Sequence, residues 1–197
     1  MSVGQKYELT GVSKVNEVGM TVHQIRATAE IARFGVKKGD LGGWVGSVTL
    51  TDGDARVSDD AWVSGAAQVF GDARVSDDAW VSGAAQVFGD ARVSDDAQVS
   101  GDAQVSGDAQ VEENWHYIAV SPIGSEGVTA TLCRTEKGKH ILSVGCWSGT
   151  LGTLMAEVKR RRQSWYGDEA QHELWVSQYR AIRALGKATV ARWEVPE

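Results

Sequence analysis

A run of arginines followed by a tryptophan is the part of this 197-residue sequence best suited to holding a ligand. The run ends with Arg160, Arg161 and Arg162, and Trp165 follows three residues later. Guanidinium groups hold phosphate oxygens through paired N–H groups, and an aromatic plane stacks on a base. Arg180, on the next expected helix, would extend this basic patch. The alternative is a solvated helix end whose positive charges complement the helix dipole.

A second candidate anion site is the segment Trp147-Ser148-Gly149-Thr150, which we expect to form a turn that opens a helix. The unpaired N–H groups and the dipole at a helix N-terminus favour negative charge. The alternative is that Ser148 or Thr150 caps the helix without binding a ligand. The two segments together give the predicted ligand-binding residues Trp147, Ser148, Thr150, Arg160, Arg161, Arg162, Trp165 and Arg180.

The sequence lacks the usual signatures of catalysis. It contains no Walker loop, GxSxG elbow or HExxH helix. Its four histidines lie outside the central repeat, and we interpret them as structural or solvated. Cys146 has no histidine beside it, and Cys133 and Cys146 show no metal-ligand spacing. We therefore predict buried free thiols, no disulfide, no catalytic residue, no metal and no cofactor.

Charge is distributed unevenly along the chain, whose formal net charge is −6. Residues 54–113 carry three arginines against thirteen acidic residues, whereas residues 114–197 carry eleven basic and eight acidic residues. This polarity predicts separate modules with different surfaces. No apolar run approaches the roughly 20 residues of a membrane span, and no signal peptide is evident. We expect a protein of the host cytoplasm with no membrane contact and no direct binding to nucleic acid.

The central segment is a repeat. Valine recurs every six residues from Val57 to Val111, with an alanine two places before each valine, and residues 54–71 are copied identically as residues 72–89. An 18-residue unit of three hexads predicts a coil of three short strands whose valines and alanines point inward. The repeat resembles that of the hexapeptide-repeat β-helix family. This resemblance implies a left-handed parallel β-helix over residues 45–113.

Aromatic residues occupy outward positions of the repeat. Trp62 and Trp80 fall in one column, and Phe70 and Phe88 fall in another. Exposed apolar columns mark interfaces, and proteins of the hexapeptide-repeat family commonly form homotrimers through such faces. We therefore predict a homotrimer with these four residues at its interface. Ligand stacking on the columns is the lesser alternative.

Two flanking modules complete a mainly β fold. Residues 1–44 predict a β-hairpin cap that ends in Gly39-Asp40-Leu41-Gly42-Gly43-Trp44, a lead-in similar to that of repeat proteins common in phages and prophages. Residues 114–197 predict a small α+β domain of order βββαα, with a turn at 136–139 that places Cys133 opposite Leu142. The expected elements are strands at 116–121, 128–135 and 139–146, a helix from about Thr150, and a second helix capped by Asp168.

The favoured functional hypothesis is a phage-encoded, non-catalytic homotrimer that counters host defence. Its C-terminal domains would sequester an anionic, nucleotide-like immune signal. A second hypothesis is an inhibitor of a host defence protein, in which corner pairs such as Asp59-Asp60 and Asp77-Asp78 imitate nucleic-acid phosphates. A third is a structural virion or tail accessory. An acyltransferase, which the family resemblance also suggests, is least favoured because the coils contain no histidine base.

Overall fold

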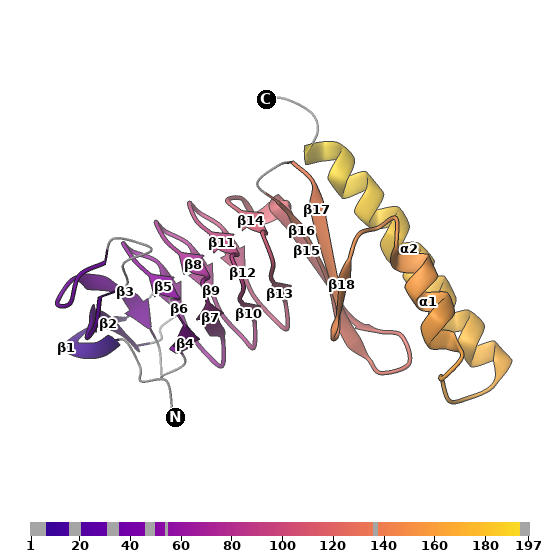
Figure 1. Cartoon of the computed structure of the whole chain (residues 1–197), viewed down its shortest axis with the longest axis horizontal. Coiled ribbons are helices and arrows are strands. Elements are labelled where there is room, and N and C mark those ends of the chain that lie inside the picture. The colour runs from indigo at the N-terminus through magenta and orange to yellow at the C-terminus, as the bar shows by residue number, and fades with distance from the viewer. Residues whose placement is uncertain are drawn as a thin grey trace.

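Three parts follow one another along the molecule: an N-terminal hairpin, a solenoid of stacked coils and a C-terminal domain (Figure 1). The C-terminal sheet lies next to the last coil, and two helices cover its opposite face. This arrangement confirms the predicted mainly β fold, with a β-solenoid followed by a small domain of sheet and helices. The structure is a computed structural model that describes residues 7–15, 21–30, 36–45, 50–53 (backbone only), 55–135 and 138–193.

The solenoid has three faces, each built from parallel strands that recur along the repeat. The strand orders are β3-β6-β9-β12, β4-β7-β10-β13 and β5-β8-β11-β14. Pairing is in register, so that Val63 lies beside Val81 and Val81 beside Val99. The strands are β3 (Leu41–Val45), β4 (Leu50–Gly53), β5 (Arg56–Val57), β6 (Trp62–Val63), β7 (Gln68–Gly71), β8 (Arg74–Val75), β9 (Trp80–Val81), β10 (Gln86–Val87), β11 (Arg92–Val93), β12 (Gln98–Val99), β13 (Gln104–Val105) and β14 (Gln110–Val111).

Valine and alanine fill the interior of the solenoid, as the repeat predicts. The valines from Val57 to Val111 are at most 4% exposed, and the alanines that stand two places before a valine, from Ala61 to Ala109, are at most 1% exposed. The β-branched valine suits a strand, and the small alanine fits beside the corner. The result is a continuous apolar core that is narrow enough for every inward residue to contact its counterpart in the next coil.

Each corner of a coil contains a residue with positive φ. Glycine supplies it in two corner columns, as at Gly65 (φ 70°) and Gly71 (φ 72°). Aspartate supplies it in the third column, where Asp59, Asp77 and Asp95 have φ values of 57°, 59° and 55°. The preceding serine donates its hydroxyl to the aspartate carboxylate in all three cases, at 2.7–3.1 Å. Aspartate is one of the few residues that tolerate this conformation, so this acidic column has a structural role.

The N-terminal hairpin covers the first coil. Strands β1 (Tyr7–Val15) and β2 (Thr21–Ala27) are antiparallel, and β2 pairs with β3. A Cβ atom on Gly42 would lie 2.7 Å from Val57 O, and one on Gly43 would lie 2.8 Å from Ala61 O. The two glycines of the lead-in are therefore required by the close approach of the next coil. Parts of the predicted hairpin, residues 16–20 and 31–35, lie outside the described residues.

The C-terminal domain consists of an antiparallel sheet and two helices. Its strands are β15 (Tyr117–Ile123), β16 (Val128–Arg134), β17 (His140–Val144) and β18 (Trp147–Gly149), in that order, and its helices are α1 (Leu154–Arg162) and α2 (Glu169–Trp193). Asp168 caps α2 as predicted, because Gln171 N donates to Asp168 Oδ1 at 2.9 Å and Asp168 N donates to Gln171 Oε1 at 3.1 Å. None of the helices in the described part of the chain has the length and apolarity of a membrane span.

Three details of this domain differ from the sequence predictions. A fourth strand, β18, follows β17, because Gly145 (φ 57°) makes a tight turn and Val144 pairs with Trp147. The first helix consequently begins at Leu154 rather than near Thr150. Cys133 lies opposite Ile141, one residue away from the predicted Leu142. Residues 136 and 137 of the predicted turn lie outside the described residues.

The register of β16 and β17 decides how the C-terminal sheet joins the solenoid. A shift of one residue exchanges the two faces of a strand. In the observed register Cys133 and Ile141 pack against the solenoid core, whereas Leu132 and Leu142 belong to the core beneath the helices. The sheet thus closes the open end of the solenoid with apolar side chains.

Side chains also replace the missing next coil at this end. Strand N–H groups of earlier coils donate to carbonyls 17 residues ahead, as Trp80 N does to Ala97 O. In the last coil Gln98 N donates instead to Asn114 Oδ1 at 2.8 Å, and Gln104 N donates to Thr131 Oγ1 at 2.9 Å. Asn114 lies in the short 3-10 helix η2 (Asn114–His116). These two backbone donors of the final coil are therefore satisfied by side chains in place of a further coil.

Candidate functional site

A pocket of about 260 Å³ opens beside the C-terminal end of α1. The β15–β16 loop, the β17–β18 turn, the segment after α1 and one side of α2 bound it. Three of the predicted ligand-binding residues, Arg160, Arg161 and Trp165, lie in its wall. The lining residues are Ser125, Glu126, Cys146, Arg160, Arg161, Ser164, Trp165, Tyr166 and Tyr179.

The two arginines of the pocket share one carboxylate. Arg160 Nε and Nη2 donate to Glu157 at 2.8 and 2.6 Å, and Arg161 Nε donates to Glu157 Oε1 at 2.7 Å. These hydrogen bonds, chiefly those from Arg160, lower the pKa of Glu157 to about 2. Glu157 is therefore ionised at neutral pH. It lies one helical turn before both arginines, which is the spacing at which such pairs form on a helix.

Aromatic rings form the other wall of the pocket. The rings of Trp165 and Tyr179 are 6.2 Å apart at an interplanar angle of 17°, and the edge contact of Trp165 with Trp175 is 5.5 Å at 84°. Tyr166 Oη donates to Ser125 O at 2.5 Å, which ties this wall to the β15–β16 loop. Burial raises the pKa of Tyr179, so its hydroxyl remains a hydrogen-bond donor. The rings are held in place before any ligand arrives.

Cys146 contributes an exposed thiol to the pocket. The prediction of a buried thiol is wrong here, because the tight β17–β18 turn projects Cys146 outward. The same prediction is confirmed for Cys133, which is 1% exposed and whose pKa burial raises to about 12. Both cysteines are free, as predicted. Arg161 Nη2 lies 3.7 Å from Cys146 Sγ and donates to it.

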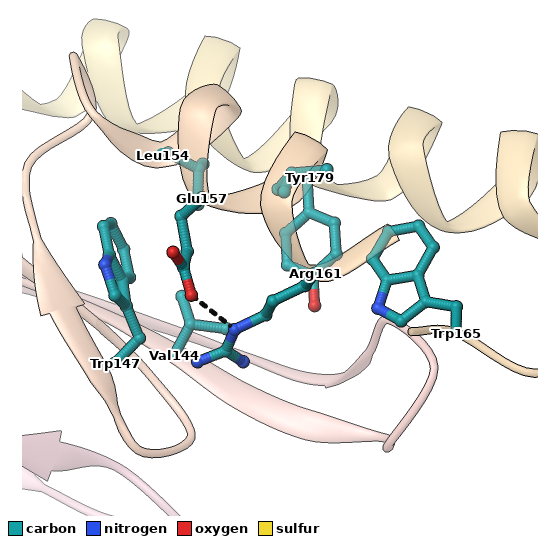
Figure 2. A pocket seen from close by; sticks show the side chains of 8 residues that line it. Val144, Trp147, Leu154, Glu157, Arg161, Trp165 and Tyr179 are labelled. Atoms are coloured by element: carbon teal, nitrogen blue, oxygen red, sulfur yellow. Dashed lines mark hydrogen bonds and ion pairs between the residues drawn. The ribbon is translucent and has the colours of Figure 1, made fainter. Parts of the chain in front are cut away.

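A much smaller inner cavity of about 10 Å³ lies behind Arg161. Figure 2 shows Glu157 and Arg161 pointing from α1 toward the sheet, between Trp147 on one side and Trp165 on the other. The inner cavity and the outer pocket share Arg161, Trp165 and Tyr179 in their walls. Arg161 therefore lies between the two spaces, whereas Glu157 lines the inner cavity.

Two predicted arginines lie away from this pocket. Arg162 points to α2, where it donates to Glu169 and, at 2.7 Å, to Glu173. Arg180 lies 4.0 Å from the same Glu173 carboxylate. The basic run is thus divided between two sets of carboxylates, because successive residues of a helix point in different directions.

The predicted anion site at the start of α1 is not formed as expected. Trp147 and Ser148 lie in β18, and Thr150 precedes α1 by several residues. Ser148 Oγ lies within hydrogen-bond distance of Ser143 Oγ, at 3.3 Å, and Thr150 N donates to Thr153 Oγ1 at 3.0 Å. The prediction that this segment opens a helix is therefore wrong. Trp147 lines the inner cavity instead.

Several residues of the pocket escaped sequence reasoning. Ser125, Glu126 and Tyr179 belong to segments far from the arginines, and no pattern in the sequence links them. Glu157 carries a usable signal, because an acidic residue three and four positions before two arginines on a helix predicts ion pairs. The described residues contain no group of three or more histidine, cysteine or acidic side chains suited to a metal ion.

The aromatic columns of the solenoid are in register. Trp44, Trp62 and Trp80 are paired neighbours in β3, β6 and β9, with the Trp62 and Trp80 rings 6.3 Å apart. Phe70 and Phe88 are stacked at 5.0 Å. Each of these rings is partly buried within the chain. Sequence reasoning missed Trp44 as the first member of its column.

The repeat segment matches a family model. Residues 67–83, 85–101 and 97–113 each match the model described as YdcK Beta solenoid repeat. The searches of curated proteins and of solved structures gave no match to the chain. The matched residues all lie in the solenoid, so this likeness identifies a β-solenoid repeat protein and assigns no role to the pocket.

Proposed function

We propose that this chain is a non-catalytic binding protein whose C-terminal domain holds a small anionic ligand with an aromatic ring. The observation that carries the proposal is the pocket itself, in which Arg160 and Arg161 face a fixed wall that includes Trp165 and Tyr166. Guanidinium groups suit phosphate oxygens, and aromatic planes suit a base. The solenoid serves as a rigid stalk that carries this domain.

The size of the pocket limits the ligand. Its volume of about 260 Å³ is slightly below the ~300–1,000 Å³ typical of sites for drug-sized ligands. One nucleoside carrying one phosphoryl group is therefore a better match than a dinucleotide or an ADP-ribose-type molecule. We infer that each protomer binds its ligand separately.

Cys146 provides a native reporter for testing the proposal. The chain has two cysteines, and Cys133 is buried. The rate at which a maleimide modifies Cys146 would be measured while nucleoside monophosphates are titrated. We expect saturable protection, because the ligand would cover the thiol. Absence of protection by every monophosphate, together with no heat in calorimetry, would reject the function.

A matched pair of double variants locates the site. Arg160→Ala with Arg161→Ala should remove the protection, because both guanidiniums line the pocket. Arg162→Ala with Arg180→Ala removes the same charge from arginines that contact Glu173 elsewhere. This control should keep the protection, and circular dichroism would verify that both proteins are folded. Loss of protection in the control alone would move the site to α2.

The assembly and the biological setting are also proposals. We propose a homotrimer in the host cytoplasm, encoded by a phage and acting against host defence, with the Trp62–Trp80 and Phe70–Phe88 columns between subunits. The in-register aromatic pairs on the faces of the solenoid support the assembly. A monomeric mass in solution would refute the trimer. Growth of a phage lacking the gene at wild-type rates on every defended host would refute the counter-defence role.

One observation favours a second candidate function, the binding of a host protein by the acidic stalk. The aspartates at the Asp59, Asp77 and Asp95 corners share one backbone conformation, so their charges form a regular column. Regular negative charge along a rod resembles a phosphate backbone. Changing Asp59, Asp60, Asp77, Asp78, Asp95 and Asp96 to asparagine, which also tolerates the left-handed conformation of the corner, should abolish inhibition if this candidate is correct. Unchanged inhibition would exclude it.

A further inference from the structure

Glu157 engages the guanidinium donors that a ligand's anionic group would need. Its carboxylate receives three hydrogen bonds of 2.6–2.8 Å from Arg160 and Arg161, the two cations in the wall of the pocket. The Glu157 side chain is 13% exposed, whereas that of Arg160 is 70% exposed. Arg160 is therefore largely open to solvent and Arg161 is mostly buried, while guanidinium donors of both are already engaged by Glu157.

We infer that Glu157 is an internal competitor that a ligand's phosphoryl group must displace from Arg160 and Arg161. The inference rests on the proposed function. A carboxylate has one negative charge and two oxygens. A phosphate monoester near neutral pH has a charge of about −1.5 to −2 and three acceptor oxygens. A phosphodiester has a single charge and gains little in the exchange.

The surroundings of Glu157 are consistent with such an exchange. Arg161 lies between the outer pocket and the inner cavity, and its guanidinium donates to Glu157 and to the Cys146 thiol. Glu157 lies with Trp147 and Leu154 in the wall of the inner cavity (Figure 2), so that displacement leaves its carboxylate without guanidinium partners, a cost that the phosphoryl group must exceed. The competitor remains ionised in the folded protein, so that its removal requires substitution rather than mild acid.

The test compares two isosteric variants. Glu157→Gln removes the competing charge beside Arg160 and Arg161, and Glu173→Gln removes the charge that faces Arg162 and Arg180 away from the pocket. Titration calorimetry would measure the Kd of adenosine monophosphate and of cyclic adenosine monophosphate for each. We expect Glu157→Gln to bind the monophosphate about tenfold more tightly, since a freed charge-assisted contact is worth about 1.4 kcal/mol or more. Glu173→Gln should equal the wild type.

The cyclic ligand sharpens the result. The wild type should discriminate against the diester, and Glu157→Gln should bind both nucleotides more tightly while it keeps the preference for the monophosphate, because the cost of displacing the carboxylate is common to both ligands. Glu157→Asp, whose shorter side chain reaches the arginines less well, should fall between the two. This variant also guards against misfolding of Glu157→Gln.

The possible failures are distinguishable. If the wild type binds the monophosphate but neither Glu157 variant binds it more tightly, the competitor role is overturned and the proposed function stands. If Glu157→Gln binds the monophosphate and the wild type does not, the competitor role is supported. If no protein binds either nucleotide, both the competitor role and the proposed function are overturned.

Discussion

The solenoid and the C-terminal domain use their residues in opposite ways. Each coil repeats the contacts of the one before, so that Trp62 N donates to Ala79 O and Trp80 N donates to Ala97 O. Around the pocket no contact recurs, as when Arg161 donates to Glu157 and Tyr166 donates to Ser125. A repeated surface presents the same few groups at every level, whereas a ligand site needs different groups that converge. We therefore expect length to be the variable property of the solenoid, and we expect ligand binding to belong to the domain at its end.

The largest expected effect comes from breaking the repeated core. Val81 is 0% exposed, so that Val81→Asp would bury an unpaired carboxylate in a core one side chain wide. The cost would consume a large part of the ~5–15 kcal/mol that stabilises a typical domain. We expect loss of folding, measured by circular dichroism and urea titration. Gln98→Asp, at an exposed position of the same face, should remain folded; equal behaviour of the two variants would contradict the inward placement.

A smaller effect is expected from alanine substitutions at two corner glycines, which distinguish the cost of the backbone conformation from the cost of crowding the next coil. Gly83 (φ 69°) and Gly101 (φ 68°) have the same conformation, but a Cβ on Gly83 would lie 2.9 Å from Gly101 N, whereas one on Gly101 meets nothing within 4 Å. Gly101→Ala should cost about 1–2 kcal/mol through its left-handed conformation. Gly83→Ala should cost at least about 1 kcal/mol more, because the next coil must shift. Equal free energies of unfolding for the Gly83→Ala and Gly101→Ala variants would show that the next coil shifts at little energetic cost.

The smallest expected effect on ligand binding comes from deleting one coil of the solenoid, which tests directly whether the solenoid or the C-terminal domain binds the ligand. Deleting residues 72–89 removes one coil and joins Gly71 to Asp90, the same dipeptide that Gly89 forms in the native chain. All remaining strands keep their partners' register, so we expect a folded protein, somewhat less stable for lack of one stacking interface, with an unchanged Kd for its ligand. Calorimetry would measure that Kd. Loss of binding in this protein, with the Arg160 and Arg161 double variant still binding, would place the function on the stalk.

Much of the solenoid could be predicted because the same residue pattern recurs in every coil, so that each coil gives independent evidence for the same structure. The six-residue spacing of valine from Val57 to Val111 fixes strand length, core and register at once, and in-register pairing of Arg56, Arg74 and Arg92 follows from it. The positive φ at the Asp77 corner is compatible with the sequence but was visible only in the structure. The requirement for glycine at positions 42 and 43 likewise follows only from the structure, because backbone atoms of the next coil lie too close to allow a Cβ atom.

The sequence of the C-terminal domain determined that two helices follow a sheet, that Asp168 caps α2, and that arginines and Trp165 lie near one helix end. Only the tertiary structure decided that Trp147 continues the sheet and that Arg161 and Arg162 face different carboxylates. It also brought Ser125 and Cys146 to the same pocket. The physical reason is that strand pairing, helix direction and loop closure act between segments far apart in the chain. Outside a repeat, the spacing of residue types along the chain does not predict these contacts.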